Sequence, residues 1–114
     1  MKTQSSLVTI GMPLLNEGRY LSKALDSLLN QSFSDFEIII SDNASTDETA
    51  EIAKNYAKKD QRIRYYRTDS RVGGRENFNR LFQLSSGKYF MWASGHDLWH
   101  KDFQNTQKAL GRVL

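Results

Sequence analysis

Three short polar segments of this 114-residue sequence contain the residue types best suited to chemistry. They are residues 13–18 (PLLNEG), 42–47 (DNASTD) and 94–97 (SGHD). Their carboxylates, amides and imidazole can hydrogen-bond a polar ligand, and the carboxylates and imidazole can also coordinate a divalent cation. Each segment directly follows an apolar run, so the elements formed by those runs decide whether the three segments meet.

Four apolar runs have the length and the β-branched or aromatic content of buried strands. These runs are residues 7–12, 36–40, 63–67 and 89–93. Between them, apolar residues recur at spacings of three and four, which is typical of amphipathic helices. The predicted helices cover residues 19–30, residues from about 45 to 58, and residues 76–85. This alternation predicts an α/β fold: a Rossmann-like, mainly parallel sheet with helices on both faces.

Local signals refine these elements. Ser45 and Glu48 have the spacing of a capping box, which predicts that the second helix starts near Ser45. Gly87 is expected to adopt a left-handed cap after the third helix. Trp92 lies in an apolar strand and is expected in the core. The third helix is predicted to bury four apolar side chains, Phe78, Leu81, Phe82 and Leu84.

In an open parallel sheet, ligands bind beyond the carboxyl ends of the strands. The three polar segments follow the first, second and fourth predicted strands, so they should open on the same edge of the sheet. We therefore expect those strands to be parallel and close together, with Pro13, Asp42 and His96 facing one cleft.

Several common classes of protein are excluded by composition and motifs. The chain has no cysteine, which excludes disulfides and thiolate metal sites. It lacks the glycine patterns of dinucleotide-binding folds and of phosphate-binding loops. Met12 and Pro13 stand where a phospho-receiver domain needs an acidic pair. The net charge is +3, but the basic residues are scattered, which argues against nucleic acid as a partner.

No apolar run approaches the roughly 20 residues needed to cross a bilayer, and no signal peptide is evident. The sequence therefore predicts a soluble protein without a transmembrane segment, and the absence of cysteine favours a cytoplasmic location.

The order and spacing of five motifs resemble the inverting nucleotide-sugar glycosyltransferases of family 2, which have the GT-A fold. The resemblance covers residues 7–103, nearly the whole chain. Its motifs are VTIGMP at 8–13 with Asn16-Glu17, LLNQSF at 28–33, FEIIISDNASTD at 36–47, GKY at 87–89 and HDLW at 96–99.

The resemblance implies that the chain binds a nucleotide-diphosphate sugar, UDP-linked by preference, and that an acceptor hydroxyl attacks the sugar. It places Pro13, Asn16 and Glu17 along the nucleotide and assigns base recognition to Asp42 and Asn43. It also implies a divalent metal, Mn²⁺ or Mg²⁺, that bridges the diphosphate and neutralises the charge on the leaving group.

The sequence departs from the family pattern at two motifs. Asn43 replaces the second of two successive acids, so a pure acceptor becomes an amide that also donates. The two acids of the family's metal-binding D-x-D motif align with Ser94 and His96, which leaves His96 and Asp97 as the predicted metal ligands. Imidazole favours softer cations than Mg²⁺.

Other candidate residues have competing interpretations. Asn16 and Glu17 could instead form a turn before the first helix. Asp47 is best explained as a helix-start residue, because its carboxylate favours the positive end of the helix. Arg75 is either a ligand of the diphosphate or a solvated loop arginine.

Residues 1–114 are expected to form one nucleotide-sugar-binding part of a glycosyltransferase domain, whose acceptor-binding part and catalytic base would follow residue 110 or so. The isolated chain should then lack transferase activity and leave an apolar face that promotes self-association. The main alternative is a nucleotide-binding module without catalysis, such as a degenerate relative. A more distant alternative is an unrelated α/β interaction domain.

Overall fold

The computed structural model of the protein describes residues 7–94 and 112–113. It contains one five-stranded sheet in the order β3-β2-β1-β4-β5. The strands are β1 (Val8–Leu14), β2 (Phe36–Asp42), β3 (Ile63–Arg67), β4 (Tyr89–Trp92) and β5 (Arg112–Val113). The first four are parallel to one another, and β5 pairs antiparallel with β4.

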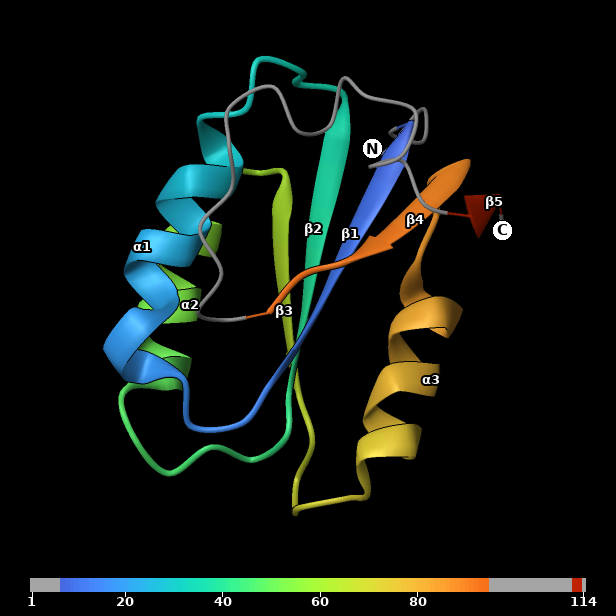
Figure 1. The fold of residues 1–114 in the computed structure, drawn as a ribbon. Coiled ribbons are helices and arrows are strands. Elements are labelled where there is room, and N and C mark those ends of the chain that lie inside the picture. Colours follow the sequence, from blue (N-terminus) through green and yellow to red (C-terminus); the bar gives the residue numbers. More distant parts are fainter. Residues whose placement is uncertain (1–6, 95–111, 114) are drawn as a thin grey trace.

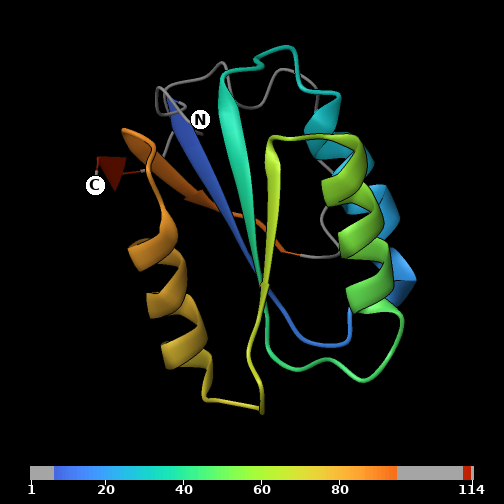
Figure 2. The same cartoon turned by 180° about the vertical axis from the view of Figure 1, so that it is seen from behind.

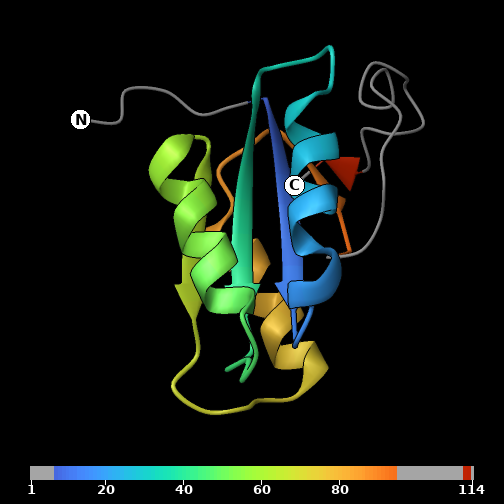
Figure 3. The ribbon, with the colours of Figure 1, turned by 90° about the vertical axis from the view of Figure 1, so that its left-hand side faces the viewer.

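Helices cover both faces of the sheet, as predicted (Figure 1). They are α1 (Gly18–Leu29), α2 (Thr49–Lys59) and α3 (Gly74–Leu84). Figure 3 shows α1 and α2 side by side on one face, and the reverse view in Figure 2 shows α3 on the other. None of these helices, within the part of the chain that the structure describes, is long and apolar enough to cross a membrane.

The main core lies between the sheet and the α1–α2 layer. Its fully buried members include Ile10, Leu25 and Ile38, which alternate along the strands or repeat along α1 as the sequence pattern requires. A smaller core of Ile39, Leu81 and Phe90 lies under α3. The two cores hold the sheet between two layers and thereby fix the positions of the strand ends.

Strand β1 runs two residues beyond its predicted end at Met12 and includes Pro13. Successive residues of a strand direct their backbone groups to opposite sides. Leu14 accepts a bond from Asn43 N on the β2 side, while Gly11 accepts one from Ala93 N on the β4 side. Pro13 therefore faces the β4 side, beyond the last β1–β4 pair, where its missing N–H breaks no ladder bond.

The predicted start of the second helix near Ser45 is wrong, because α2 begins at Thr49. Ser45 does not form a capping box. Its hydroxyl accepts a bond from Asn16 N at 2.8 Å, and its own N–H donates to Asp42 Oδ1 at 3.0 Å. The side chain that meets the start of α2 is instead Asp47, whose Oδ1 accepts from Thr49 N at 2.9 Å.

The predictions for Phe78, Phe82 and Trp92 are also wrong. These side chains are 43%, 45% and 37% exposed, whereas Leu81 is fully buried as predicted. Phe78 and Phe82 of α3 pack against aromatic side chains of β4, with ring centroids 4.6 Å apart for both the Phe78–Trp92 and the Phe82–Phe90 pair. Among the described residues, these contacts cover only part of each ring, so Phe78, Phe82 and Trp92 stay partly exposed while Phe90 beneath them is buried.

Gly87 does not form the predicted left-handed cap, since the cap residue of α3 is Ser85, in an extended conformation. The reason for glycine at position 87 is close packing. A Cβ atom there would lie 2.6 Å from Thr9 N and 2.9 Å from Val8 C, both backbone atoms of β1. Gly87 N also donates to Thr9 Oγ1 at 2.7 Å. Glycine thus lets the chain enter β4 against β1.

Candidate functional site

A pocket of about 560 Å³ opens at the carboxyl ends of the parallel strands β1 and β4, beside the residue that follows β2. This is the edge at which open α/β sheets bind ligands. Apolar side chains form much of its wall, and a few polar groups converge on it. The lining residues are Pro13, Leu14, Leu15, Glu17, Asn43, Arg71, Val72, Gly74, Asn77, Phe78, Trp92, Ala93 and Ser94.

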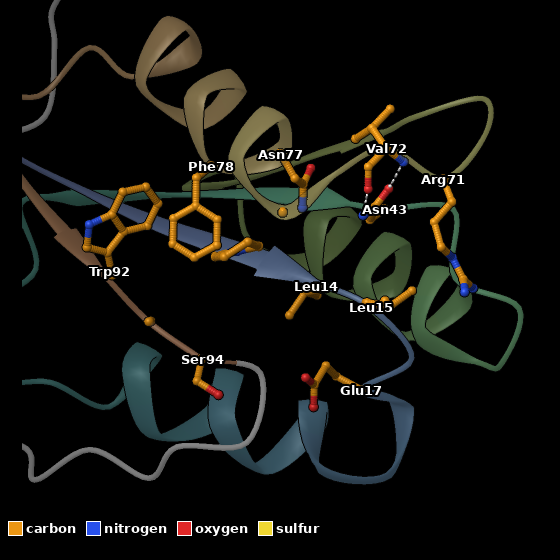
Figure 4. Close-up of a pocket in the computed structure, with 13 residues that line it drawn as sticks. Leu14, Leu15, Glu17, Asn43, Arg71, Val72, Asn77, Phe78, Trp92 and Ser94 are labelled. Atoms are coloured by element: carbon orange, nitrogen blue, oxygen red, sulfur yellow. Dashed lines mark hydrogen bonds between the residues drawn. The ribbon is translucent and has the colours of Figure 1, made fainter.

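The two ends of the pocket differ in character (Figure 4). Phe78 and Trp92 stand together at one end, with their ring centroids 4.6 Å apart. Asn43 and Arg71 lie toward the other end. The pocket can therefore contact an apolar or planar group at one end and a polar or anionic group at the other.

Asn43 is 6% exposed, and both ends of its amide are engaged by the backbone of one residue. Its Nδ2 donates to Val72 O at 2.8 Å, and its Oδ1 accepts from Val72 N at 2.8 Å. A carboxylate at this position would lose the first bond because it has no donor. An amide at position 43, in place of the acid expected from the family pattern, can therefore both donate to and accept from the loop at Val72 and hold it in place.

A second amide, Asn77 of α3, secures the same wall of the pocket. Ser41 Oγ donates to Asn77 Oδ1 at 2.6 Å, and Asn77 Nδ2 donates to Ser41 O at 3.0 Å. Asn43 therefore fastens the segment between β3 and α3, and Asn77 fastens the first turn of α3, to the carboxyl end of β2. Each amide makes two hydrogen bonds, which gives this wall a defined position beside the pocket.

Asp42 does not line the pocket, although it ends β2. Its side chain is fully buried and has three partners: Ser45 N, the hydroxyl of Tyr65 and Arg67 Nη1, the last at 3.4 Å. Burial, followed by the bond to Asp42, raises the pKa of Tyr65 to about 12. The phenol therefore remains a donor to this carboxylate throughout the neutral range.

Asn16 also lies outside the lining, and its hydrogen bonds join two loops. The residue adopts a left-handed backbone with φ of 54°, which asparagine tolerates well. Its Oδ1 accepts from Thr46 N at 2.8 Å and from Asp47 N at 3.3 Å. Asn16 thus ties the loop after β1 to the loop after β2. This role corresponds to the alternative interpretation, in which Asn16 forms a turn before the first helix.

Asp47 completes this connection between the loops and joins the starts of two helices. Its Oδ1 accepts from Thr49 N in α2, and its Oδ2 accepts from Gly18 N, the first residue of α1, at 3.0 Å. Burial opposes ionisation, but the bonds from Thr49 and Gly18 outweigh it and lower the pKa of Asp47. The helix-start prediction for Asp47 is supported, with the addition that it serves two helices.

Of the predicted ligand-binding residues, the structure brings Pro13, Glu17 and Asn43 to the pocket and leaves out Asn16, Asp42 and Arg75. His96 and Asp97 lie outside the described residues. Within residues 7–94, no three His, Cys, Asp or Glu side chains are grouped to hold a metal ion. The described residues alone therefore do not form a site for the metal that the resemblance implies.

The sequence interpretation missed Arg71, Val72, Asn77, Phe78 and Trp92 as pocket residues. Phe78 and Trp92 are assigned to the core in the sequence analysis, because helical and strand periodicity does not show which face remains uncovered. Asn77 could have been found, since a polar residue within an apolar helical stripe needs a buried partner.

Comparison with known proteins agrees with this architecture. Residues 9–110 match the family model described as glycosyl transferase family 2. Glycosyltransferase GlyG of Streptococcus pneumoniae is 28% identical over 94 residues, a region covering 82% of this chain and 31% of GlyG. The chain therefore spans about a third of the length of this relative.

Two solved structures share the fold. The crystal structure of S. aureus TarS residues 1–349 superposes with a TM-score of 0.79 and 24% identity, covering 86% of this chain and 30% of that one. Mannosyltransferase PcManGT from Pyrobaculum calidifontis gives a TM-score of 0.83 at 21% identity, covering 95% and 33%. Because the family model matches most of its length, this chain belongs to glycosyl transferase family 2.

Proposed function

We propose that this chain supplies the nucleotide-sugar-binding part of a glycosyltransferase that moves a sugar from a nucleotide-diphosphate donor, UDP-linked by preference, to an acceptor hydroxyl. The observation that carries the proposal is the pocket at the carboxyl ends of β1 and β4 in a chain of this family. TarS has been solved with UDP and with UDP-GlcNAc, and PcManGT with GDP-Man and Mn²⁺. Those ligands support a nucleotide-sugar donor here.

The chemistry of the walls suits such a donor. Apolar side chains such as Leu15 and Val72, which are 40% and 38% exposed, offer contact area to a planar base. Arg71 at the rim offers a guanidinium to a phosphate oxygen. In the transfer itself, the acceptor oxygen bonds to the anomeric carbon as the bond to the diphosphate breaks. The protein must hold both reactants in line for that step.

A divalent cation, when bound, would neutralise charge on the leaving diphosphate. We assign its ligands to His96 and Asp97, with Mn²⁺ preferred over Mg²⁺ because imidazole suits softer ions. Replacing His96 by Ala should remove the Mn²⁺-dependent gain in UDP affinity and spare most of the metal-free binding. An unchanged Mn²⁺ gain would transfer the metal role to Asp97 alone or rule the metal out.

The donor site can be tested by calorimetric titration of UDP and UDP-glucose into two matched variants. Leu15→Glu places a new carboxylate in the pocket, whereas Tyr20→Glu places one on α1, where Tyr20 is 47% exposed. Repulsion of the diphosphate should weaken binding to Leu15→Glu about tenfold or more, and Tyr20→Glu should bind like the parent. Equal affinities for both variants would place the nucleotide elsewhere, and an absence of binding to the parent would refute the proposal.

A nucleotide-binding module without catalysis remains the second candidate, because Ser94 and His96 occupy the positions of the family acids. The two candidates share the pocket and differ in turnover. An assay for hydrolysis or transfer of UDP-glucose by the protein separates them.

A further inference from the structure

Residues 68–73, the segment between β3 and α3, are attached to the rest of the protein at a few defined points. At the start of the segment, Thr68 N donates to the last residue of β2 at 3.0 Å. At its end, Gly73 O accepts a backbone N–H of α3 at 3.1 Å. Among the described residues, positions 69–71 make no hydrogen bond between these two points. The path of the segment therefore depends on what holds Val72.

The side chain of Asn43 holds Val72 through two bonds of 2.8 Å, one to its N–H and one to its carbonyl oxygen. We call this pair of bonds the Asn43 clamp. Asn43 is itself fixed, because it is 6% exposed and its backbone N–H donates to Leu14 O at 2.9 Å. The N–H of Val72 belongs to the planar peptide unit that starts at Arg71. The clamp therefore fixes the orientation of the Arg71–Val72 peptide.

Arg71 has the one cationic side chain among the described residues that line the pocket, and Glu17 has the one acidic side chain. Arg71 is exposed and lies toward the same end of the pocket as Asn43 (Figure 4). A long arginine side chain loses rotamer freedom when it binds an anion, and an unfixed backbone adds to that entropic cost. Fixing the peptide after Arg71 thus favours anion binding by its guanidinium.

We propose that Asn43 is a positioning residue that acts through Arg71: its clamp holds the Arg71–Val72 peptide so that the guanidinium meets the diphosphate of the donor. This inference rests on the proposed function. It assigns to Asn43 a different role from the base recognition that the resemblance implies. An amide suits the role because Val72 presents one donor and one acceptor, and a carboxylate has no donor for the second bond.

The clamp can be tested without any nucleotide by limited digestion with trypsin, which cleaves after Arg71 when this exposed segment opens. Removing both bonds with Asn43→Ala should accelerate that cleavage about tenfold relative to cleavage at other sites of the same sample. Asn43→Asp keeps the acceptor and loses the donor, so it should give a smaller acceleration. Arg71→Gln identifies the cleavage product by removing it. An unchanged relative rate in both Asn43 variants would show that the clamp does not hold the segment.

The action through Arg71 is tested by calorimetric titration of UDP and uridine into the parent, Arg71→Gln, Asn43→Ala and the double variant. Arg71→Gln should lower UDP affinity about tenfold, as expected for a lost charge-assisted bond, and leave uridine affinity within about twofold. Asn43→Ala should lower UDP affinity about fivefold and also spare uridine. In the Asn43→Ala background, Arg71→Gln should cost no more than about twofold, because the two residues act as a unit.

Asn77→Ala is the matched control, because it removes the other buried, doubly bonded amide of this wall, whose partner is Ser41. Arg71→Gln should cost the same factor in UDP affinity in the Asn77→Ala background as in the parent. Circular dichroism verifies each fold, and Asn43→Ser replaces Asn43→Ala if the alanine variant does not fold.

Two binding results would overturn the proposal. The first is additive losses for Asn43→Ala and Arg71→Gln, which would show that Asn43 does not act through Arg71. The second is a loss of uridine affinity in Asn43→Ala as large as the loss of UDP affinity, which would mean that the amide contacts the nucleoside. Failure of the parent to bind UDP would instead refute the proposed function, and the digestion would still decide whether the clamp exists.

Discussion

At the scale of single residues, the polar positions of this chain do more to hold loops in place than to face the pocket. Asp47, Asn16 and Asp42 all belong to motifs that suggest ligand binding, yet each accepts hydrogen bonds from loop or helix-start backbone, and Asp42 also accepts from the side chains of Tyr65 and Arg67. Carboxylates and amides at strand ends can accept several N–H groups at once. They therefore suit the task of fixing two loops at a fixed separation.

Asp47→Ala should destabilise the protein by about 1–2 kcal/mol, because it removes the acceptor at the starts of both α1 and α2. Urea unfolding monitored by circular dichroism measures the change. Glu51→Ala is the control, as Glu51 is an exposed acid in the first turn of α2. If Asp47→Ala lowers the free energy of unfolding no more than Glu51→Ala does, Asp47 does not stabilise the starts of α1 and α2.

Glu37 should make the stability of the protein depend on pH. Its buried carboxylate accepts from Thr9 Oγ1 at 2.6 Å and Ser86 N at 2.9 Å, and it pairs with Arg64 at 2.9 Å. Burial by itself would raise the pKa of Glu37, but these bonds and the ion pair outweigh it and lower the pKa. When the pKa of a carboxyl group is lower in the folded state than in the unfolded state, its ionisation stabilises the fold. This stabilisation is complete at pH values above the unfolded-state pKa and is lost as the pH falls through the folded-state pKa.

The free energy of unfolding should therefore decline as pH falls below the ordinary glutamate value of about 4.3. Glu37→Gln, which lacks the charge, should be less stable by about 1.5–3 kcal/mol at neutral pH and should lose part of that acid dependence. Denaturant titrations at several pH values test both points. An identical acid dependence in the parent and Glu37→Gln would show that other groups cause it.

At the scale of secondary structure elements, close contact between the entry of β4 and β1 decides how the sheet is assembled. Gly87 is the contact residue, and its Cβ position is occupied by β1 backbone. Gly74, the first residue of α3, offers the opposite case, because nothing lies within 4 Å of its Cβ position.

Gly87→Ala should destabilise the protein by roughly 1–3 kcal/mol, because the added methyl forces apart two backbones that cannot yield independently. Gly74→Ala should be neutral or stabilising, since alanine favours the helix and meets no obstacle. Comparing the thermal unfolding of Gly87→Ala and Gly74→Ala separates the steric effect of the added methyl group from the effect of replacing a glycine. Similar melting temperatures for the two variants would disprove the close packing at Gly87.

At the scale of the whole molecule, the pocket depends on elements that are far apart in sequence. Its walls come from the ends of β1 and β4, the residue after β2, and the segment leading into α3. The chain spans about a third of GlyG, of TarS residues 1–349 and of PcManGT. Our proposal for its function therefore concerns donor binding, and transfer also requires an oriented acceptor and a group that removes its proton.

We predict that the 114-residue chain binds UDP without detectable sugar transfer to simple saccharide acceptors. Calorimetry with UDP and a UDP-release assay with UDP-glucose measure the two properties on the same sample. Robust transfer by this chain alone would show that it already holds an acceptor site and a base.

Much of this architecture could be predicted from the sequence because it depends on local periodicity. Strand β3 has its predicted bounds, Ile63–Arg67, and α1 differs from its predicted helix by one residue at each end. Alternation of strands and helices was enough to predict the parallel order and the edge where Pro13 and Asn43 line a pocket. Motif order was enough to predict the family.

Only the tertiary structure decided which apolar and polar residues face the pocket. Phe78 and Trp92 have the same periodic pattern as buried residues, but they pack against each other at one end of the pocket and stay 43% and 37% exposed. Asp42 and Asn43 are neighbours in sequence, but successive residues at a strand end point in opposite directions, so one is buried under β3 side chains and the other meets Val72. Periodicity indicates which side chains share one face of a helix or strand. The neighbours of that face in space determine whether those side chains are covered.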